Sequence, residues 1–129
     1  MVQAPVEDVR AFLEDPVQAA SLTPDVLSVE VLEDNECDLV KTTNAGLVSS
    51  VAYVVLRCYP DEGVVETLVE SEDFTHYGAA YALEETEGGT QVTYSVTVGI
   101  DLPVPDWTIR IGLERSTAAT MEALVAHFD

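Results

Sequence analysis

The C-terminal part of the chain places the tightest limit on the fold. Residues 92–100 (VTYSVTVGI) alternate between apolar and small polar side chains, which predicts a β-strand with one buried face. Pro103 and Pro105 break this pattern. A single helical pattern follows, from about Trp107 to Phe128, and it is longer than any helical pattern before it. A long helix that closes a sheet in this way can leave an apolar cavity between the two layers.

The preceding residues predict two short helices and then a series of strands. The first helix is expected at Pro5–Leu13, and a single further turn at Val17–Leu22. Strands separated by short turns are expected at Val26–Glu33, Cys37–Thr43, Leu47–Tyr59, Val64–Ser71, Phe74–Glu85 and Thr90–Asp101. Short turns between successive strands require antiparallel pairing. A chain of 129 residues is the size of one domain, so we expect a single α+β domain over residues 1–129.

Acidic residues dominate the charge of the chain. It carries 24 Asp and Glu against 5 Lys and Arg, which gives a formal net charge of −19. Such a field repels nucleic acid and anionic membrane surfaces, so neither is expected as a partner. The apolar fraction of 47% is too high for a disordered acidic chain. We therefore expect a halophilic source, in which molar salt screens the carboxylates; an ordinary acidic protein is the alternative.

Targeting, metal and cofactor signals are not visible in the sequence. The N-terminus does not resemble a signal peptide and no apolar run is long enough to cross a membrane, which leads us to expect a cytoplasmic protein. Cys37 and Cys58 lack metal-binding spacing and are interpreted as structural thiols. His76 and His127 fall in different elements, so no metal site is expected. No cofactor motif or Ser-His-Asp order is present.

Three segments, taken with the order of the elements, resemble one known superfamily. They are residues 4–16 (APVEDVRAFLEDP), residues 89–94 (GTQVTY) and residues 103–105 (PVP). Together they resemble the START-like or Bet v 1-like helix-grip superfamily (SRPBCC), which includes polyketide cyclase/dehydrase-like and lipid-transfer proteins. The resemblance implies a curved antiparallel sheet of six to seven strands, wrapped around the C-terminal helix, with a cavity for an apolar or amphipathic ligand. It carries over no universal catalytic residues.

One departure from the superfamily concerns the first strand. Members usually begin with a full strand that pairs with the last strand, whereas only Met1–Ala4 precede Pro5 here. Either this strand is a stub or a start codon lies further upstream. A stub would leave the last strand partly unpaired, and such an edge could recruit a second subunit to form a homodimer.

The charged candidates for ligand contact lie on the last helix and on one strand. On a helical wheel Arg110 and Glu114 fall inside the apolar face, four residues apart, so they could pair with each other. They are interpreted either as a polar clamp for a ligand or as an ion pair that reaches water at the helix start. Arg57 shares an apolar strand face with Tyr53. It would need a carboxylate partner or a bound anion if that face points inward; exposure at the strand end is the alternative.

The remaining candidates are aromatic. Tyrosines on strands could line an amphipathic cavity and donate hydrogen bonds, or could simply pack in the core. Trp107 could cover the cavity or anchor the helix. The full set of candidate ligand-binding residues is Tyr53, Arg57, Tyr77, Tyr81, Tyr94, Trp107, Arg110 and Glu114.

These observations favour a protein that binds a small hydrophobic or amphipathic molecule, such as a lipid, isoprenoid quinone or polyketide-like compound, without a cofactor. The alternative is an enzyme of the cyclase, aromatase or dehydratase type. It would need a general base and a group that polarises a carbonyl, for which Glu114 and Arg110 are the only pair we nominate. A second alternative is a module for a protein partner, with a collapsed cavity. The lack of a convincing buried acid/base pair favours binding.

Overall fold

The computed structural model describes residues 1–45, 50–100 and 105–129. Two short helices open the chain, α1 (Val6–Glu14) and α2 (Pro16–Ala20), and one long helix closes it, α3 (Asp106–His127). Between them lie the strands β1 (Val26–Glu33), β2 (Asp38–Asn44), β3 (Val51–Cys58), β4 (Gly63–Glu70), β5 (Phe74–Thr86) and β6 (Gly89–Ile100). This is the expected order. The turn and strand start expected at residues 46–49, the strand end at 101 and the proline segment at 103–104 lie outside the described residues.

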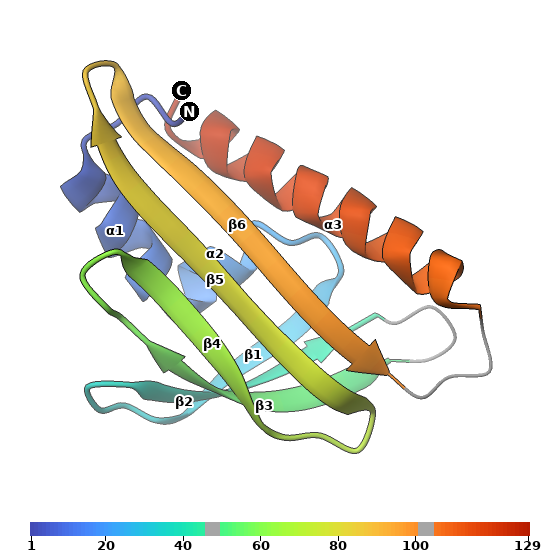
Figure 1. Ribbon diagram of the computed structural model, residues 1–129. Coiled ribbons are helices and arrows are strands. Elements are labelled where there is room, and N and C mark those ends of the chain that lie inside the picture. The colour runs from blue at the N-terminus through green and yellow to red at the C-terminus, as the bar shows by residue number, and fades with distance from the viewer. Residues whose placement is uncertain (46–49, 101–104) are drawn as a thin grey trace.

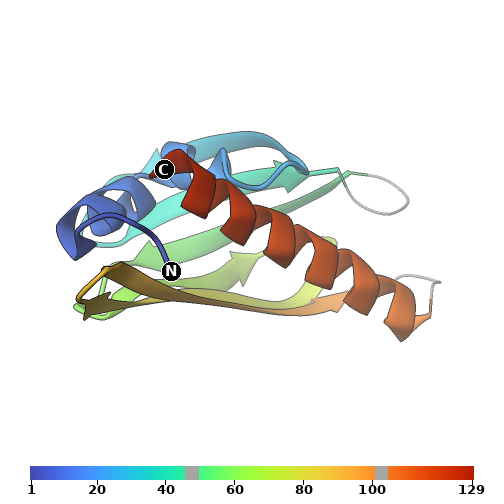
Figure 2. The ribbon, with the colours of Figure 1, turned by 90° about the horizontal axis from the view of Figure 1, so that it is seen from above.

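The strands form one antiparallel six-stranded sheet in the order β1-β2-β3-β4-β5-β6. The sheet is strongly bent, and α1, α2 and α3 lie on its concave side (Figures 1 and 2). This arrangement confirms the predicted helix grip, with six strands. No helix in the described part of the chain has both the length and the apolar character to span a bilayer.

Local sequence signals explain where the first helices begin and end. α1 buries Val9, Phe12 and Leu13, which recur at helical spacing. The side chain of Asp15 accepts hydrogen bonds from the backbone N–H groups of the first turn of α2, and Pro16 occupies the first helical position. Two short helices therefore follow one another with a sharp change of direction.

Two apolar clusters form the core and they leave part of α3 without a core contact. One cluster joins the N-terminal segment and α1 to the C-terminal half of α3, where Leu124 is 0% exposed. The other lies on the sheet and includes Val40 and Val55. Every α3 residue in these clusters comes from the C-terminal half of the helix. The N-terminal half is therefore free to cover a cavity.

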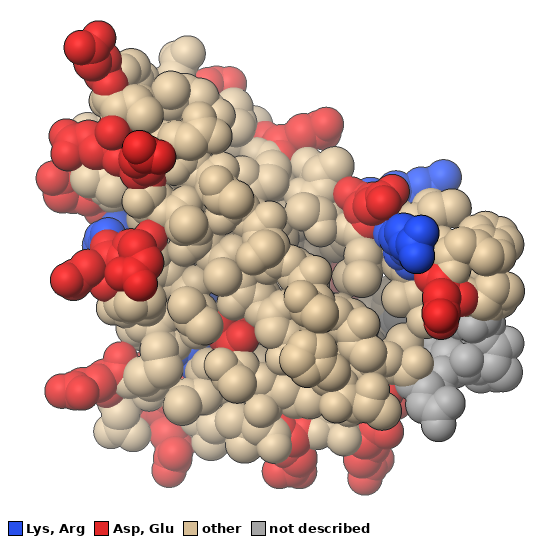
Figure 3. Space-filling view, viewed as in Figure 1, with Lys and Arg blue, Asp and Glu red and all other residues tan. Residues whose placement is uncertain are grey.

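Charged side chains are spread unevenly over the outer surface. In Figure 3 acidic side chains gather around the rim of the face over β4, β5 and β6, and the middle of that face is mostly uncharged. The residues that β5 and β6 turn outward alternate with buried residues such as Tyr77, Ala79 and Tyr81. In the middle of the two strands they are small and uncharged: Gly78, Ala80, Ala82, Thr93, Ser95 and Thr97. Larger or charged residues, His76, Glu84 and Gln91, are exposed only toward the strand ends.

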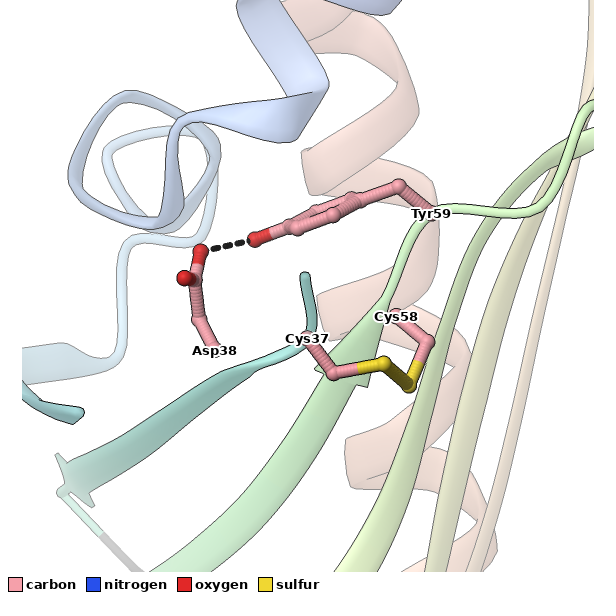
Figure 4. The surroundings of a disulfide bond; sticks show 4 residues. All are labelled: Cys37, Asp38, Cys58 and Tyr59. Atoms are coloured by element: carbon pink, nitrogen blue, oxygen red, sulfur yellow. Dashed lines mark hydrogen bonds between the residues drawn. A yellow bond between two sulfur atoms is a disulfide. The ribbon is translucent and has the colours of Figure 1, made fainter. Parts of the chain in front are cut away.

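The cysteines form a disulfide, so their interpretation as structural thiols is wrong. Cys37 and Cys58 are bonded, with their Cα atoms 4.4 Å apart (Figure 4). The cause is the pairing register, because Asp38 lies opposite Arg57 and the cysteines are the next pair along. Their separation of 21 residues in the sequence carries no signal of this contact. Disulfides are rare in reducing compartments, so this bond does not support the cytoplasmic location expected from the sequence, which stays a prediction.

Candidate ligand-binding cavity

A cavity of about 210 Å³ lies between the concave face of the sheet, α2 and the N-terminal half of α3. For scale, an apolar cavity of about 150 Å³ holds a benzene ring. Much of the wall is aliphatic and is contributed by Val29, Val40, Val51, Val96, Val98 and Leu113. The cavity therefore has the size and the lining expected for a small, largely apolar molecule.

Aromatic rings form a second part of the wall, and all four strand tyrosines nominated from the sequence belong to it. The ring centroid of Tyr53 lies 4.6 Å from that of Tyr77 and 5.1 Å from that of Phe74. Tyr81 and Tyr94 are stacked, with centroids 4.4 Å apart. The inward orientation expected for Tyr94 is confirmed. These rings offer flat apolar surfaces and hydroxyl groups side by side.

Arg57 is the charged residue at the centre of the site. It is 1% exposed on β3, and its Nε donates to Oε2 of Glu66 at 2.9 Å. Glu66 lies directly opposite on β4, and its Oε1 accepts a hydrogen bond from the hydroxyl of Tyr77 at 3.2 Å. Of the two placements left open for Arg57, the structure has the inward one with a carboxylate partner. A buried guanidinium needs such a partner because desolvation of a lone charge costs several kcal/mol.

The pairing of Arg57 leaves one of its nitrogen atoms unused. Nη1 is buried and has no hydrogen-bond partner among the residues described. A buried polar group without a partner costs about 1–3 kcal/mol. Both Arg57 and Glu66 line the cavity, so an oxygen atom of a bound molecule would satisfy this nitrogen.

The strand ends next to Arg57 are held by two further contacts (Figure 4). The hydroxyl of Tyr59 donates to the carboxylate of Asp38, which lies opposite Arg57 on β2. The Cys37–Cys58 disulfide joins the same two strands one residue further along. Burial and the hydrogen bond to Asp38 raise the pKa of Tyr59 to about 12. Together these contacts limit the movement of the strand end that carries Arg57.

The cavity tyrosines are held in their protonated form. Burial is the largest cause and raises the pKa of Tyr53, Tyr77, Tyr81 and Tyr94 above the ordinary value for a phenol. The negative charge of Glu66 raises each of these pKa values further. At neutral pH the cavity therefore presents hydroxyl donors and no phenolate.

The candidates on α3 lie elsewhere. Arg110 and Glu114 are exposed, Trp107 is 61% exposed, and none of the three lines the cavity. Within the described ranges Arg57–Glu66 is the only ion pair, so the expected pairing of Arg110 with Glu114 is not observed. The residues of α3 that line the cavity are Ile109, Gly112, Leu113, Ser116 and Thr117.

The misplaced face of α3 has a simple cause. Met121, Val125 and Phe128 pack against the cluster that joins α1 and the N-terminal segment to Val64, Tyr81 and Val92 of the sheet. A wheel drawn over the whole helix averages these contacts with those of the first turns. The average rotates the apparent apolar face toward Arg110 and Glu114, although the first turns face the sheet with another side.

Sequence reasoning missed Glu66, Tyr59 and Asp38. On β4 the apolar residues Val65 and Val69 are 40% and 55% exposed, whereas the charged Glu66 faces inward. The pattern of apolar residues on this strand therefore indicates the wrong inner face. The turn Pro60–Gly63 did contain a usable signal. A hairpin closed at this turn aligns Arg57 with Glu66, and an inward arginine requires a carboxylate.

The fold and the cavity define a helix-grip protein with a cavity between its sheet and its last helix. The chain belongs to the family described as polyketide cyclase / dehydrase and lipid transport, whose model matches residues 1–129. No curated protein matches the chain.

Solved structures share the fold across nearly the whole chain. A START superfamily protein from Mycobacterium smegmatis is 16% identical with a TM-score of 0.83, and the match covers 98% of this chain and 91% of that one. The Zhui aromatase/cyclase from a Streptomyces strain is also 16% identical with a TM-score of 0.83, covering 98% and 87%. Ara h 8.0201 is 18% identical with a TM-score of 0.66, covering 98% and 91%. At these identities the likeness establishes the fold alone.

Proposed function

We propose that the protein binds a small, largely apolar molecule that carries an oxygen acceptor. The observation that supports this most directly is the buried Arg57, which is paired with Glu66 through Nε and unpartnered at Nη1 within a cavity of aliphatic and aromatic side chains. Burial of apolar surface supplies about 25 cal/mol per Å² of binding free energy. Arg57 and the tyrosine hydroxyls orient the molecule.

The charge of the site favours a neutral ligand over an acid. Glu66 already balances the charge of Arg57, and a ligand carboxylate would add a second negative charge beside Glu66. Like charges in a buried site cost free energy unless one of them is protonated. A carbonyl, phenol or quinone oxygen can accept from Nη1 without this cost. Ring-containing polyketide-like or isoprenoid quinone compounds fit these requirements, which agrees with the description of the family.

The test compares three probes of one shape: 2-naphthol, naphthalene and 2-naphthoate. We expect the wild-type protein to bind 2-naphthol about tenfold more tightly than either of the others. Arg57→Met combined with Glu66→Gln removes the ion pair without leaving one charge buried, and should abolish this preference. Arg110→Met is the matched control, because Arg110 is exposed and outside the cavity. Equal affinities for all three probes in the wild type would refute the proposal.

Native mass spectrometry of protein purified from its own source complements the titration. We expect a co-purified neutral, oxygen-containing molecule in the wild type and its loss in the Arg57→Met/Glu66→Gln variant.

A second candidate is a cyclase or dehydratase. It is favoured by Nη1 of Arg57, which could polarise a substrate carbonyl in a buried site. A general base is harder to assign, since both oxygens of Glu66 accept hydrogen bonds and the tyrosines are held protonated. Arg110 and Glu114 do not serve, because both are exposed outside the cavity. Incubation of the protein with a carbonyl-rich thioester, with the loss of water monitored by mass spectrometry, tests this candidate.

A partner-binding module with a collapsed cavity has no support from a cavity of about 210 Å³.

A further inference from the structure

The cavity wall holds a second buried polar atom without a partner, in addition to Nη1 of Arg57. Oδ1 of Asn44 is buried and accepts no hydrogen bond from the residues described. Asn44 is the last residue of β2, and it lines the cavity. A buried amide oxygen has lost its hydrogen bonds to water, so it costs free energy until a donor replaces them.

The residues opposite Asn44 do not supply this donor. They are Val26 on β1 and Val51 on β3, which are both aliphatic and both line the cavity. The nitrogen of the same amide is already in use, because Nδ2 donates to the hydroxyl of Tyr53 at 3.5 Å. This bond orients the amide, and it leaves Oδ1 available to a donor on a bound molecule.

Strand register places Asn44 and Arg57 at opposite ends of the cavity. Arg57 lies opposite Asp38, the first residue of β2, whereas Asn44 is the last residue of that strand. Six steps of extended chain separate Asp38 from Asn44, which corresponds to about 20 Å between their backbones. Both side chains contribute to the same cavity wall, so one elongated molecule can contact both ends.

Polar groups also mark the path between the two ends. Beside Arg57, Glu66 accepts a hydrogen bond from the hydroxyl of Tyr77. The ring of Tyr77 lies against that of Tyr53, with centroids 4.6 Å apart, and Tyr53 accepts the hydrogen bond from Asn44. The chain of contacts thus begins at an unpartnered donor, Nη1 of Arg57, and ends at an unpartnered acceptor, Oδ1 of Asn44.

We propose that the bound molecule has two polar ends, with a hydroxyl that donates to Asn44 and an oxygen that accepts from Arg57. This inference rests on the function proposed above and specifies its ligand more closely. A molecule with one oxygen would leave Oδ1 of Asn44 buried without a partner. A quinone with carbonyl oxygens alone has the same defect, whereas an elongated ring compound with a free hydroxyl at its far end satisfies both atoms.

The test compares probes that differ at the far end: 2-naphthol, 6-methoxy-2-naphthol and 2,6-dihydroxynaphthalene. The methoxy oxygen accepts hydrogen bonds but cannot donate one. In calorimetric titrations of the wild-type protein we expect the diol to bind about fivefold more tightly than either of the others. The two equivalent orientations of the diol account for only about twofold of this gain. 4-Phenylphenol and 4,4′-dihydroxybiphenyl repeat the comparison over a longer span.

Asn44→Leu identifies the residue that is responsible. It replaces the amide with an aliphatic side chain of similar size, so it should remove the gain from the second hydroxyl. The preference for 2-naphthol over naphthalene should persist, because Arg57 is unchanged. Asn35→Leu is the matched control, since Asn35 is exposed in the turn between β1 and β2. The wild-type comparison uses no variant and decides the proposal independently of the stability of Asn44→Leu.

The outcomes separate this inference from the proposed function. A preference for 2-naphthol over naphthalene, with no gain from a second hydroxyl at either length, would overturn the inference and leave the proposed function intact. Equal binding of the diol and the methoxy compound would also overturn it, because Asn44 would then not act as an acceptor. A gain that depends on Asn44, without any preference for 2-naphthol over naphthalene, would support the Asn44 contact and contradict the role proposed for Arg57.

Discussion

Arg57 shows how one buried charge organises its surroundings. Its guanidinium donates to Glu66, and Glu66 also accepts a hydrogen bond from Tyr77. On the neighbouring strand β2, Asp38 lies opposite Arg57 and accepts a hydrogen bond from Tyr59. Each contact crosses between neighbouring strands and none is local in sequence. The site is therefore only as stable as the pairing of β2, β3 and β4.

Removing the partner of Arg57 should destabilise the protein strongly. In Glu66→Ala the guanidinium stays buried without a carboxylate, which typically lowers the free energy of unfolding by about 3–5 kcal/mol. Denaturant unfolding followed by circular dichroism measures the change. Glu70→Ala, at an exposed position of the same strand, should change it by less than about 0.5 kcal/mol. Similar effects of the two substitutions would contradict a structural role for the Arg57–Glu66 pair.

The buried tyrosines predict a loss of stability in alkali. An unfolded chain ionises its tyrosines near pH 10, whereas the folded chain holds these protons at higher pH. Above pH 10 the unfolded state therefore binds fewer protons, and the free energy of unfolding falls as the pH rises. Stability should be intact below pH 10 and decline as the pH rises through about 12, the pKa of folded Tyr59.

Thermal melts between pH 8 and 12, with tyrosinate absorbance recorded in parallel, measure this decline. Tyr59→Phe should reduce the slope of stability against pH above pH 10, because one raised pKa is removed. Ionisation of all five tyrosines near pH 10 without unfolding would show that they are not buried as described.

At the scale of the elements, each end of α3 has a different task. The C-terminal half packs against α1 and the N-terminal segment, and the N-terminal half roofs the cavity. β2 and β3 are similarly divided, since their inner faces supply cavity residues while one end is closed by the disulfide. Elements that are uniform in secondary structure thus carry distinct contacts along their length.

The disulfide should stabilise the β2–β3 pair measurably. It links residues that are 21 apart in the sequence, and a cross-link over a loop of this size contributes about 3 kcal/mol. Cys37→Ser/Cys58→Ser should lower the free energy of unfolding by about this amount. Reductant should bring the wild-type protein to the same value and leave the variant unchanged. Thiol labelling of the denatured, unreduced protein provides the check, because two reactive thiols would mean that the bond does not form.

At the scale of the whole molecule, the charge is the dominant feature. With a net charge of −19 and most acidic side chains on the surface, the folded state is opposed by repulsion between its own carboxylates. Molar salt shortens the Debye length to about 3 Å and screens this repulsion. The halophilic origin expected from composition remains a prediction of this physical argument.

Stability should therefore increase with salt. We expect the midpoint of thermal unfolding to fall on transfer from molar to dilute KCl, because the carboxylates are no longer screened. Melts followed by circular dichroism over a KCl series measure this shift. Chloride is preferable to sulfate, which strengthens apolar burial by a separate mechanism. A midpoint that does not change across the series would rule out salt adaptation.

Sequence patterns alone were sufficient for the features that depend on near neighbours. Helical spacing, strand alternation and turn residues predicted the order of the elements, the helix grip and the inward side of Tyr94, because each signal is contained within a few residues. The sequence also limited Arg57 to two placements, exposed at the strand end or inward with a carboxylate or anion as partner, because a buried arginine needs a negative charge beside it.

Tertiary structure decided everything that depends on register or on which neighbour a surface meets. The choice of Glu66 as the partner of Arg57 and the bond between Cys37 and Cys58 follow from strand pairing, which shifts every cross-strand contact if it moves by one residue. The exposure of Arg110 and Glu114 follows from α3 meeting different neighbours along its length. Hydrophobic periodicity reports that a side chain is apolar, and it does not report which surface will cover it.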